Sequence, residues 1–349
     1  MTGADAPRVG RLAAGPRGTL CDVAGVTVGH ATIAAGDLQT GVTVVRPHAG
    51  DPFVDKVPAA AVVINGFGKA VGLTQVNELG VLETPIGLTN TFSVNTVATA
   101  QIRAAIAAHA GIARTTTSVN PLVLECSDAY LSDMQALAVE ERHYGEALAA
   151  ATIDFARGAV GAGRGMTCFG LKGGIGTASR EALAGARRFT VGALVLANFG
   201  RLECLTLAGR RIGPALVPRI AAREPPRDQG SVIVVLACDA PLDHRQLRRV
   251  ATRAAAGIGR TGSYYGHGSG DIALAFSTAW TVPHAARATI LEQPVLAEPL
   301  LEGLFEAAAE ATEQAIVDAL FRAETVTGFD GHVRHALLDI APDWASLPV

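Results

Sequence analysis

The chain has 349 residues, of which 49% are hydrophobic and 17% are charged, and its formal net charge is -3. This length and apolar content allow a large core, as one large α/β domain or two smaller ones. The small net charge excludes the basic stripe of a nucleic-acid-binding protein and the acidic tail of a solvating segment. We therefore expect small molecules or further copies of the chain as partners.

The N-terminal residues, the length of the apolar runs and the cysteines indicate the cellular compartment. Residues 1–18 are small, polar and broken by Pro7 and Pro16, so we expect them to be disordered and to carry no signal peptide. No later run reaches the roughly 18 apolar residues that span a bilayer. The five cysteines are scattered singly, without metal-ligand spacing. These features predict a cytoplasmic protein with reduced thiols, and no membrane or metal partner.

The first third of the chain alternates strands with helices. Strands are predicted over 21–30, 40–45 and 59–64, and turn chemistry at Asn65-Gly66-Phe67-Gly68 leads into a helix over 69–79. A strand over 84–94 and an alanine-rich helix over 95–110 follow, and Gly111 ends that helix. His30 is interpreted as structural, because no second ligand lies at metal spacing.

Polar residues end the next apolar strand. Leu122-Val123-Leu124 leads directly to Glu125, Asp128 and Tyr130. Strand ends are where α/β proteins usually carry their chemistry. The alternative, from this stretch alone, is a capping aspartate and a core tyrosine.

A helix is predicted over 136–158, and a glycine-rich stretch from Gly161 to Ser179 follows it. The stretch lacks the phosphate-loop motif and the complete dinucleotide fingerprint. Gly174-Ile175-Gly176-Thr177-Ala178-Ser179 nevertheless resembles the phosphate loop of small-molecule kinases of the galactokinase type. A plainer interpretation is a hairpin with a β-turn at its tip, near Lys172.

A strand over 189–197 ends at Asn198, and a charged, proline-bearing linker over 218–230 precedes Ser231. The apolar, β-branched run Val232 to Leu236 then predicts a central strand covered on both faces. Ser231 thus lies at a boundary between solvent and core. If its hydroxyl attacks the Gly230 carbonyl and the bond breaks, Ser231 becomes a terminus with a nucleophile and an amine of pKa about 7.7 to 8.0. Alternatively, Ser231 merely opens a strand.

The rest of the chain also alternates helices with strands. A helix is predicted from Asp239 to Ala256, with a basic face on solvent or a subunit, and Gly266 to Asp271 lead into a strand over 272–276. A long amphipathic helix over 300–323 follows. Four strand ends now carry Tyr130, Asn198, Ser231, and Ser269 with Asp271. Together they supply a nucleophile, a base, an orienting group and an oxyanion donor, the parts that acyl transfer requires.

The motifs, taken in order, resemble those of the DmpA-like aminopeptidases, a family of L-aminopeptidase/D-esterases and β-peptidyl aminopeptidases that mature by self-cleavage. The resemblance covers nearly the whole chain. Its most specific part is Gly230-Ser231-Val232-Ile233-Val234-Val235, followed by Asp239-Ala240-Pro241-Leu242 and Gly268-Ser269-Gly270-Asp271.

The resemblance implies an α/β fold of four layers, an αββα sandwich like that of ornithine acetyltransferase, with N-terminal-nucleophile-type function. It implies a single domain, cut between Gly230 and Ser231 into an α-chain of residues 1–230 and a β-chain of residues 231–349. It also implies roles for the residues that match the family motifs. Ser231 would be the nucleophile, Asn198 would donate to the oxyanion, and Tyr130 would lie beside the same substrate carbonyl. Ser269 and Asp271 would orient the nucleophile and its amine. Lys172 would lie near the site, and Glu125 would hold the substrate's amino group.

The predicted function is a self-processing serine aminopeptidase acting on short peptides, amides or esters, without cofactor or metal, and the resemblance favours a homotetramer of processed protomers. Two positions depart from the family pattern, because His267 and Ser127 stand where asparagine is common in relatives. The resemblance therefore predicts the reaction type more closely than the range of substrates. Alternatives are an acyltransferase on the same scaffold, a kinase using Gly173 to Ser179, and an uncleaved binding scaffold.

Overall fold

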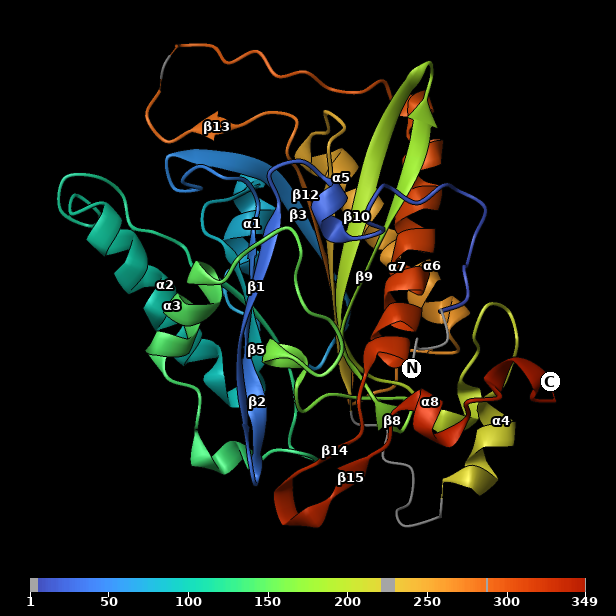
Figure 1. Cartoon of the computed structure of the whole chain (residues 1–349). Coiled ribbons are helices and arrows are strands. Elements are labelled where there is room, and N and C mark those ends of the chain that lie inside the picture. The colour runs from blue at the N-terminus through green and yellow to red at the C-terminus, as the bar shows by residue number, and fades with distance from the viewer. Residues whose placement is uncertain (1–5, 221–229, 287, 349) are drawn as a thin grey trace.

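The computed structural model describes residues 6–220, 230–286 and 288–348. Two sheets dominate it (Figure 1). The smaller sheet has four strands in the order β1-β2-β5-β6, with β5 and β6 parallel. Their bounds are Thr27–Ala35, Leu38–Arg46, Ile86–Asn90 and Leu122–Cys126.

The larger sheet has seven strands and includes the strand that begins at Ser231. Its order is β13-β3-β12-β11-β10-β9, with β4 paired to β3, and only β11 and β12 of these pairs are parallel. The bounds are Val282–Pro283, Asp55–Gly66, Gly270–Ser277, Ser231–Cys238, Arg187–Asn198 and Gly174–Ala184, with β4 at Val81–Leu82. Every residue of β11 is buried, as the uninterrupted apolar pattern predicts for a strand covered on both faces.

The two sheets pack face to face. Alternate residues of the smaller sheet, including Val45 and Leu124, meet alternate residues of the larger one, including Leu196, Ile233 and Leu274, in one fully buried cluster. Side chains alternate between the faces of a strand, so the intervening residues of β10 and β11 point to the other side. This geometry explains why the central strands are apolar at every position.

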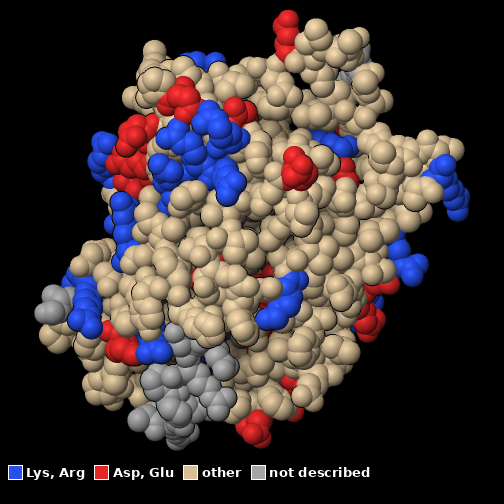
Figure 2. Space-filling view, turned by 180° about the vertical axis from the view of Figure 1, so that it is seen from behind, with Lys and Arg blue, Asp and Glu red and all other residues tan. Residues whose placement is uncertain are grey.

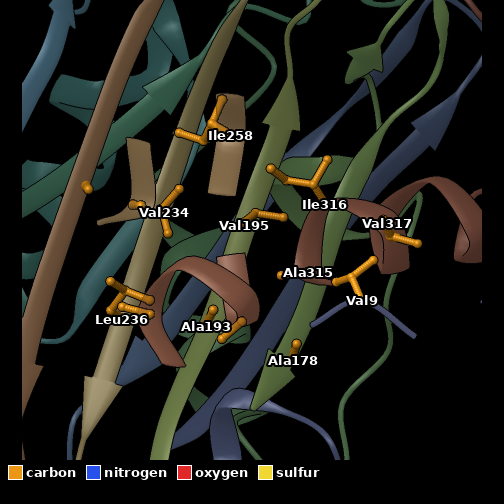
Figure 3. Packing of buried hydrophobic residues seen from close by; sticks show 14 of the residues in the cluster. Val9, Ala178, Ala193, Val195, Val234, Leu236, Ile258, Ala315, Ile316 and Val317 are labelled. Atoms are coloured by element: carbon orange, nitrogen blue, oxygen red, sulfur yellow. The ribbon is translucent and has the colours of Figure 1, made fainter. Parts of the chain in front are cut away.

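Helices cover both outer faces. Helices α2 (Val94–Ala108) and α3 (Glu141–Ala149) pack on the smaller sheet, whereas α5 (His244–Thr252), α6 (Ala254–Arg260) and α7 (Glu302–Arg322) pack on the larger one. Figure 3 shows the second interface, where Ile316 of α7 and Ile258 of α6 pack in one cluster with Ala178, Val195 and Val234 of β9, β10 and β11. The four-layer αββα sandwich is therefore confirmed.

The remaining elements are short. Helices α1 (Leu73–Leu79), α4 (Gly213–Leu216) and α8 (Leu337–Ile340) lie at the periphery, and two small hairpins are formed by β7 (Thr167–Cys168) with β8 (Leu171–Lys172) and β14 (Val326–Thr327) with β15 (Val333–Arg334).

Several predicted elements have different bounds in the structure; the strand expected over 21–30, for example, is Thr27–Ala35. The strand expected over 84–94 ends at Asn90, because the Asn90 side chain accepts a hydrogen bond from Ser93 N and begins a helical turn. The helix expected over 136–158 is only α3. The helix expected from Asp239 begins at His244, because Asp243 accepts from Gln246 N as the cap, whereas Asp239 accepts from Thr190 N.

The glycine-rich stretch is not a phosphate loop. Gly174 to Ser179 are part of β9 and pair with β10 along their length. Gly176 is glycine because a Cβ there would lie 2.0 Å from the Ala315 carbonyl oxygen of α7. Gly176 therefore allows a helix to approach the sheet, and the structure does not support the kinase alternative. The hairpin prediction is correct for β7 and β8, whose turn contains Phe169 and Gly170, both with positive φ.

Residues 6–18 have defined contacts, in contrast to the disorder expected over 1–18. Val9 is buried, Val9 N donates to Gln314 of α7, and Arg180 donates to the Val9 carbonyl. The reason lies in the tertiary structure. Arg180 and Glu310 form a buried ion pair that needs further hydrogen-bond partners, and the main chain of this segment supplies them. In the predicted linker, residues 221–229 lie outside the described residues, while Pro218 and Arg219 are exposed.

Charges are dispersed. On the face in Figure 2, basic and acidic groups lie beside one another among uncharged residues. On the basic face of α5, Arg245 and Arg249 both pair with Glu298, and Arg253 lies over Phe305. None of the helices in the described ranges is long and apolar enough to span a bilayer.

Candidate active site

Three central strands of the larger sheet bring the predicted residues together. In the register of β10 and β11 Asn198 is opposite Ser231, and in that of β11 and β12 Ser231 is opposite Gly270. Because β11 and β12 are parallel, the ends that carry Ser231 and Ser269-Gly270-Asp271 lie at the same edge of the sheet. Asn198 reaches this edge from the opposite direction, as the last residue of β10.

The Ser231 side chain is held from two sides. Gly270 N donates to its Oγ at 3.1 Å, which leaves the hydroxyl hydrogen available, and the residue is 6% exposed. Cys126 of the facing sheet places its Sγ 3.3 Å from the Ser231 carbonyl oxygen, as a weak donor. Burial raises the pKa of Cys126 well above its ordinary value, so this thiol remains protonated.

Asn198 is oriented by both ends of its amide. Its Oδ1 accepts from Thr167 N at 2.8 Å, and its Nδ2 donates to the Ser127 carbonyl at 2.9 Å. These contacts identify the oxygen and nitrogen ends of the amide. Since an amide nitrogen carries two hydrogens, one N–H remains to donate to a developing oxyanion.

The side chains of Ser269 and Asp271 are in direct contact. Ser269 Oγ donates to Asp271 Oδ1 at 2.6 Å, and both residues are buried. Asn65, at the end of β3, donates through Nδ2 to the carbonyls of Ser269 and Gly266. The turn before β12 is thereby fixed at both ends.

Gly230 passes very close to β10. A Cβ at this position would lie 2.3 Å from the Asn198 carbonyl oxygen and 2.8 Å from Phe199 Cα, and its φ is not positive. Glycine is therefore required for close backbone approach, not for a left-handed conformation. The same approach places the Gly230 carbonyl segment beside Asn198.

Glu125 lies in a separate anchored position at the end of β6. It is 3% exposed, Lys69 N donates to its Oε1 at 2.9 Å, and the Thr91 hydroxyl donates to its Oε2. A Cβ on Gly68 would contact Glu125 Oε1, Ile272 and the Gly270 Cα, so the carboxylate lies near the strand end that also positions Ser231. It is a fixed negative charge near that strand end.

Among the described residues, Tyr130 and Lys172 make their hydrogen bonds and ring contacts with residues other than Ser231. The ring of Tyr130 stacks on His332 at 4.5 Å between centroids and lies 3.3 Å from the Arg334 guanidinium carbon. Lys172 is fully buried, and its Nζ donates to the carbonyls of Gly163, Met166 and Gly173 at 2.8 to 2.9 Å. Burial lowers the pKa of Lys172 to about 7.

Lys172 is connected to Asn198 through the backbone. Its bond to the Met166 carbonyl fixes the residue that precedes Thr167, and Thr167 N in turn orients Asn198.

Asp128 is a second buried carboxylate near the site. It is 1% exposed, and burial raises its pKa to about 7. Its neighbours Thr40 and Asn90 are hydrogen-bonded to each other, and its backbone carbonyl accepts from Leu131 N and Ser132 N. Asp128 follows Ser127, whose carbonyl accepts from Asn198 Nδ2, so Asp128 lies in the turn that contacts the Asn198 side chain.

Four contributors were missed by sequence reasoning: Asn65, Thr91, Cys126 and the main chain of Thr167. Thr91 and Asn65 lie in motifs with recognisable turn chemistry, but their partners are distant in sequence. Within the described ranges, no three histidine, cysteine, aspartate or glutamate side chains are grouped as a metal site.

Comparison with known proteins agrees with this geometry. The sequence pattern of peptidase family S58 matches residues 18–334. This chain belongs to peptidase family S58. The β-peptidyl aminopeptidase BapA of Sphingosinicella xenopeptidilytica is 38% identical to this S58 chain over 90% of the chain and 83% of the relative.

Solved structures extend the likeness to the fold. A protein of Pyrococcus horikoshii is 46% identical with a TM-score of 0.89, covering 95% of this chain and 94% of that one. A Burkholderia β-aminopeptidase is 38% identical with a TM-score of 0.89 and 98% coverage of both chains. The L-aminopeptidase D-Ala-esterase/amidase of Ochrobactrum anthropi, described as a prototype of the serine aminopeptidases and a variant of the Ntn hydrolase fold, is 34% identical with a TM-score of 0.88 and 97% coverage of both. The S58 chain is thus an aminopeptidase with the Ntn hydrolase fold, and the predicted family is confirmed.

Proposed function

We propose that this S58 aminopeptidase uses Ser231 as its nucleophile and generates it by cutting its own chain between Gly230 and Ser231. The observation that carries the proposal is the convergence of Ser231, Asn198 and the Ser269-Asp271 pair at one sheet edge, with Gly230 against Asn198. These groups supply a nucleophile, an oxyanion donor and orienting groups.

Self-cleavage begins when Ser231 Oγ attacks the Gly230 carbonyl carbon through a five-membered ring. The new C–O bond forms, the C–N bond breaks, and the hydroxyl proton passes to the departing amine. Water then cleaves the ester, which leaves a carboxylate on Gly230 and restores the hydroxyl. The remaining N–H of Asn198 stabilises the oxyanion in both steps.

Substrate turnover repeats this chemistry with the new terminus. The Ser231 amine, with a reference pKa of about 7.7 to 8.0, accepts the hydroxyl proton near neutral pH. Gly270 N holds Oγ in place, and the Ser269-Asp271 pair orients the amine without a carboxylate in direct contact with it. Proton transfer and acylation thus occur on one residue.

Glu125 determines which substrates bind. Its fixed carboxylate pairs with the free amino group of a peptide, amide or ester whose carbonyl lies at Ser231. Tyr130 and Lys172 complete the site as supports, Lys172 by holding the loop that orients Asn198. The proposed location is the cytoplasm, and the proposed assembly is a homotetramer of processed protomers that requires no cofactor.

Intact mass spectrometry of purified protein tests the proposal, with Edman sequencing of the smaller fragment. We expect fragments of residues 1–230 and 231–349 in the wild type, and one intact, inactive chain for Ser231→Ala. An uncut wild-type chain that hydrolyses amino-terminal amides would refute it. No contact in the site favours the acyltransferase alternative.

A further inference from the structure

We propose that Phe67 forms an apolar subsite for the side chain of the first substrate residue, the one that is removed, an inference that rests on the proposed function. Phe67 follows the last residue of β3 and is 55% exposed, although it is one of the large apolar residues of the chain. Ligand sites combine a few polar anchors with apolar surface. The polar anchors here are Glu125 and the edge that carries Ser231, and Phe67 lies beside both.

The main chain of Phe67 packs against the residue that positions the nucleophile. Phe67 N donates to the Ser269 carbonyl at 3.2 Å, and a Cβ on Gly270 would lie 2.8 Å from the Phe67 carbonyl oxygen. Gly270 N is the group that donates to Ser231 Oγ. The position of Phe67 is therefore fixed relative to the reacting hydroxyl.

The same turn holds the carboxylate that pairs with the substrate's amine. Two residues after Phe67, Lys69 N donates to Glu125 Oε1 at 2.9 Å, and a Cβ on Gly68 would lie 3.6 Å from that oxygen. A substrate residue with its amine at Glu125 and its carbonyl at Ser231 must extend along this turn. Phe67 supplies the large apolar side chain at that place.

The neighbours of the Phe67 ring place it over the site and define the charge there. Its centroid lies 6.4 Å from that of His267, which belongs to the turn before Ser269, and Lys69 Nζ lies 4.4 Å from the ring centroid. An apolar substrate side chain gains stability by covering the exposed part of the ring. A cationic side chain would meet the ammonium of Lys69. The preferred substrates are thus peptides whose first residue is large, apolar and uncharged.

Two dipeptide amides of reversed sequence, leucyl-glycinamide and glycyl-leucinamide, test the inference. They have the same composition and differ in which side of the broken bond carries the apolar side chain. Phe67→Ala should lower the ratio of kcat/KM for the first to that for the second by about 10-fold, and Phe67→Leu should retain part of the ratio. Leu183→Ala is the matched control, because Leu183 is 60% exposed at the end of β9 remote from Asn198, where it pairs with Arg188.

The two substrates separate the possible outcomes. Equal losses for both in Phe67→Ala would assign the ring a structural role and overturn the inference. A loss confined to glycyl-leucinamide would place the ring at the leaving group and would overturn it as well. A ratio that stays at the value of Leu183→Ala would show that the ring does not contact the substrate.

Should Phe67→Ala fail to fold, the wild type decides. Its kcat/KM for leucyl-glycinamide should exceed that for glycyl-glycinamide about 10-fold. It should also prefer norleucyl-glycinamide to lysyl-glycinamide about 3- to 10-fold, because these differ chiefly in the ammonium group that Lys69 would repel. A cut, active wild type that lacks both preferences overturns this inference alone, whereas an uncut wild type that hydrolyses amino-terminal amides refutes the proposed function.

Discussion

Replacing Gly230 with alanine should slow self-cleavage strongly, because the new Cβ has no space. It would lie 2.3 Å from the Asn198 carbonyl oxygen and 2.8 Å from Phe199 Cα, whereas ordinary contacts begin at 3.4 Å. Both obstacles are main-chain atoms, one of the last residue of β10 and one of the residue after it, so no side chain can rotate away. The backbone at Gly230 must therefore move by about 1 Å, and a displacement of this size at a reacting bond costs about 100-fold in rate.

The assay is a time course of fragment formation by freshly made precursor, followed by intact mass. Gly145→Ala is the matched control, since Gly145 lies in α3 with nothing within 4 Å of its new Cβ. We expect cleavage of the Gly230 variant to be slower by about two orders of magnitude, with thermal unfolding close to that of the control. Cleavage of Gly230→Ala at the rate of Gly145→Ala would show that close approach to Asn198 does not position the bond.

Three further changes have defined outcomes. Asn198→Ala should reduce both fragment formation and kcat about 100- to 1000-fold, and an unchanged kcat would exclude it as the oxyanion donor. Glu125→Gln should raise KM for substrates with a free amino group about 10-fold or more while self-cleavage keeps its rate, because cleavage binds no amine; equal slowing of both would indicate a structural role. The pKa of Asp128 is raised to about 7 from 3.8, so its contribution to stability is present below pH 4 and lost as pH rises through 7. The difference in the free energy of unfolding between wild type and Asp128→Asn, measured with denaturant, should change by about 4 kcal/mol between pH 4 and 8, at about 1.4 kcal/mol per pKa unit. A difference that stays constant with pH would contradict this.

Local sequence was sufficient for the strands that carry the site. The run from Val232 to Leu236 is apolar at every position, and only a strand covered on both faces requires that pattern. The polar residues at its start, and at Asn198 and Ser269, mark where strands leave the core. Family motifs then supplied the expected roles.

The structure corrected inferences that depend on distant partners. Gly174 to Ser179 resemble a phosphate loop in isolation, yet the closeness of α7 explains Gly176. Residues 6–18 are polar and form no core of their own. They are held in place because the buried Arg180-Glu310 pair requires hydrogen-bonding partners, which their main chain supplies.

The sequence by itself determined the strand pattern, the boundary at Gly230-Ser231 and the kinds of group at each strand end, because these depend on neighbours along the chain. Only the tertiary structure decided that Cys126 contacts the Ser231 carbonyl and that the turn containing Phe67 lies against both Glu125 and Gly270. Such contacts join residues on different strands and loops. Their geometry is determined by how the two sheets stack and where the loops cross, which no local pattern encodes.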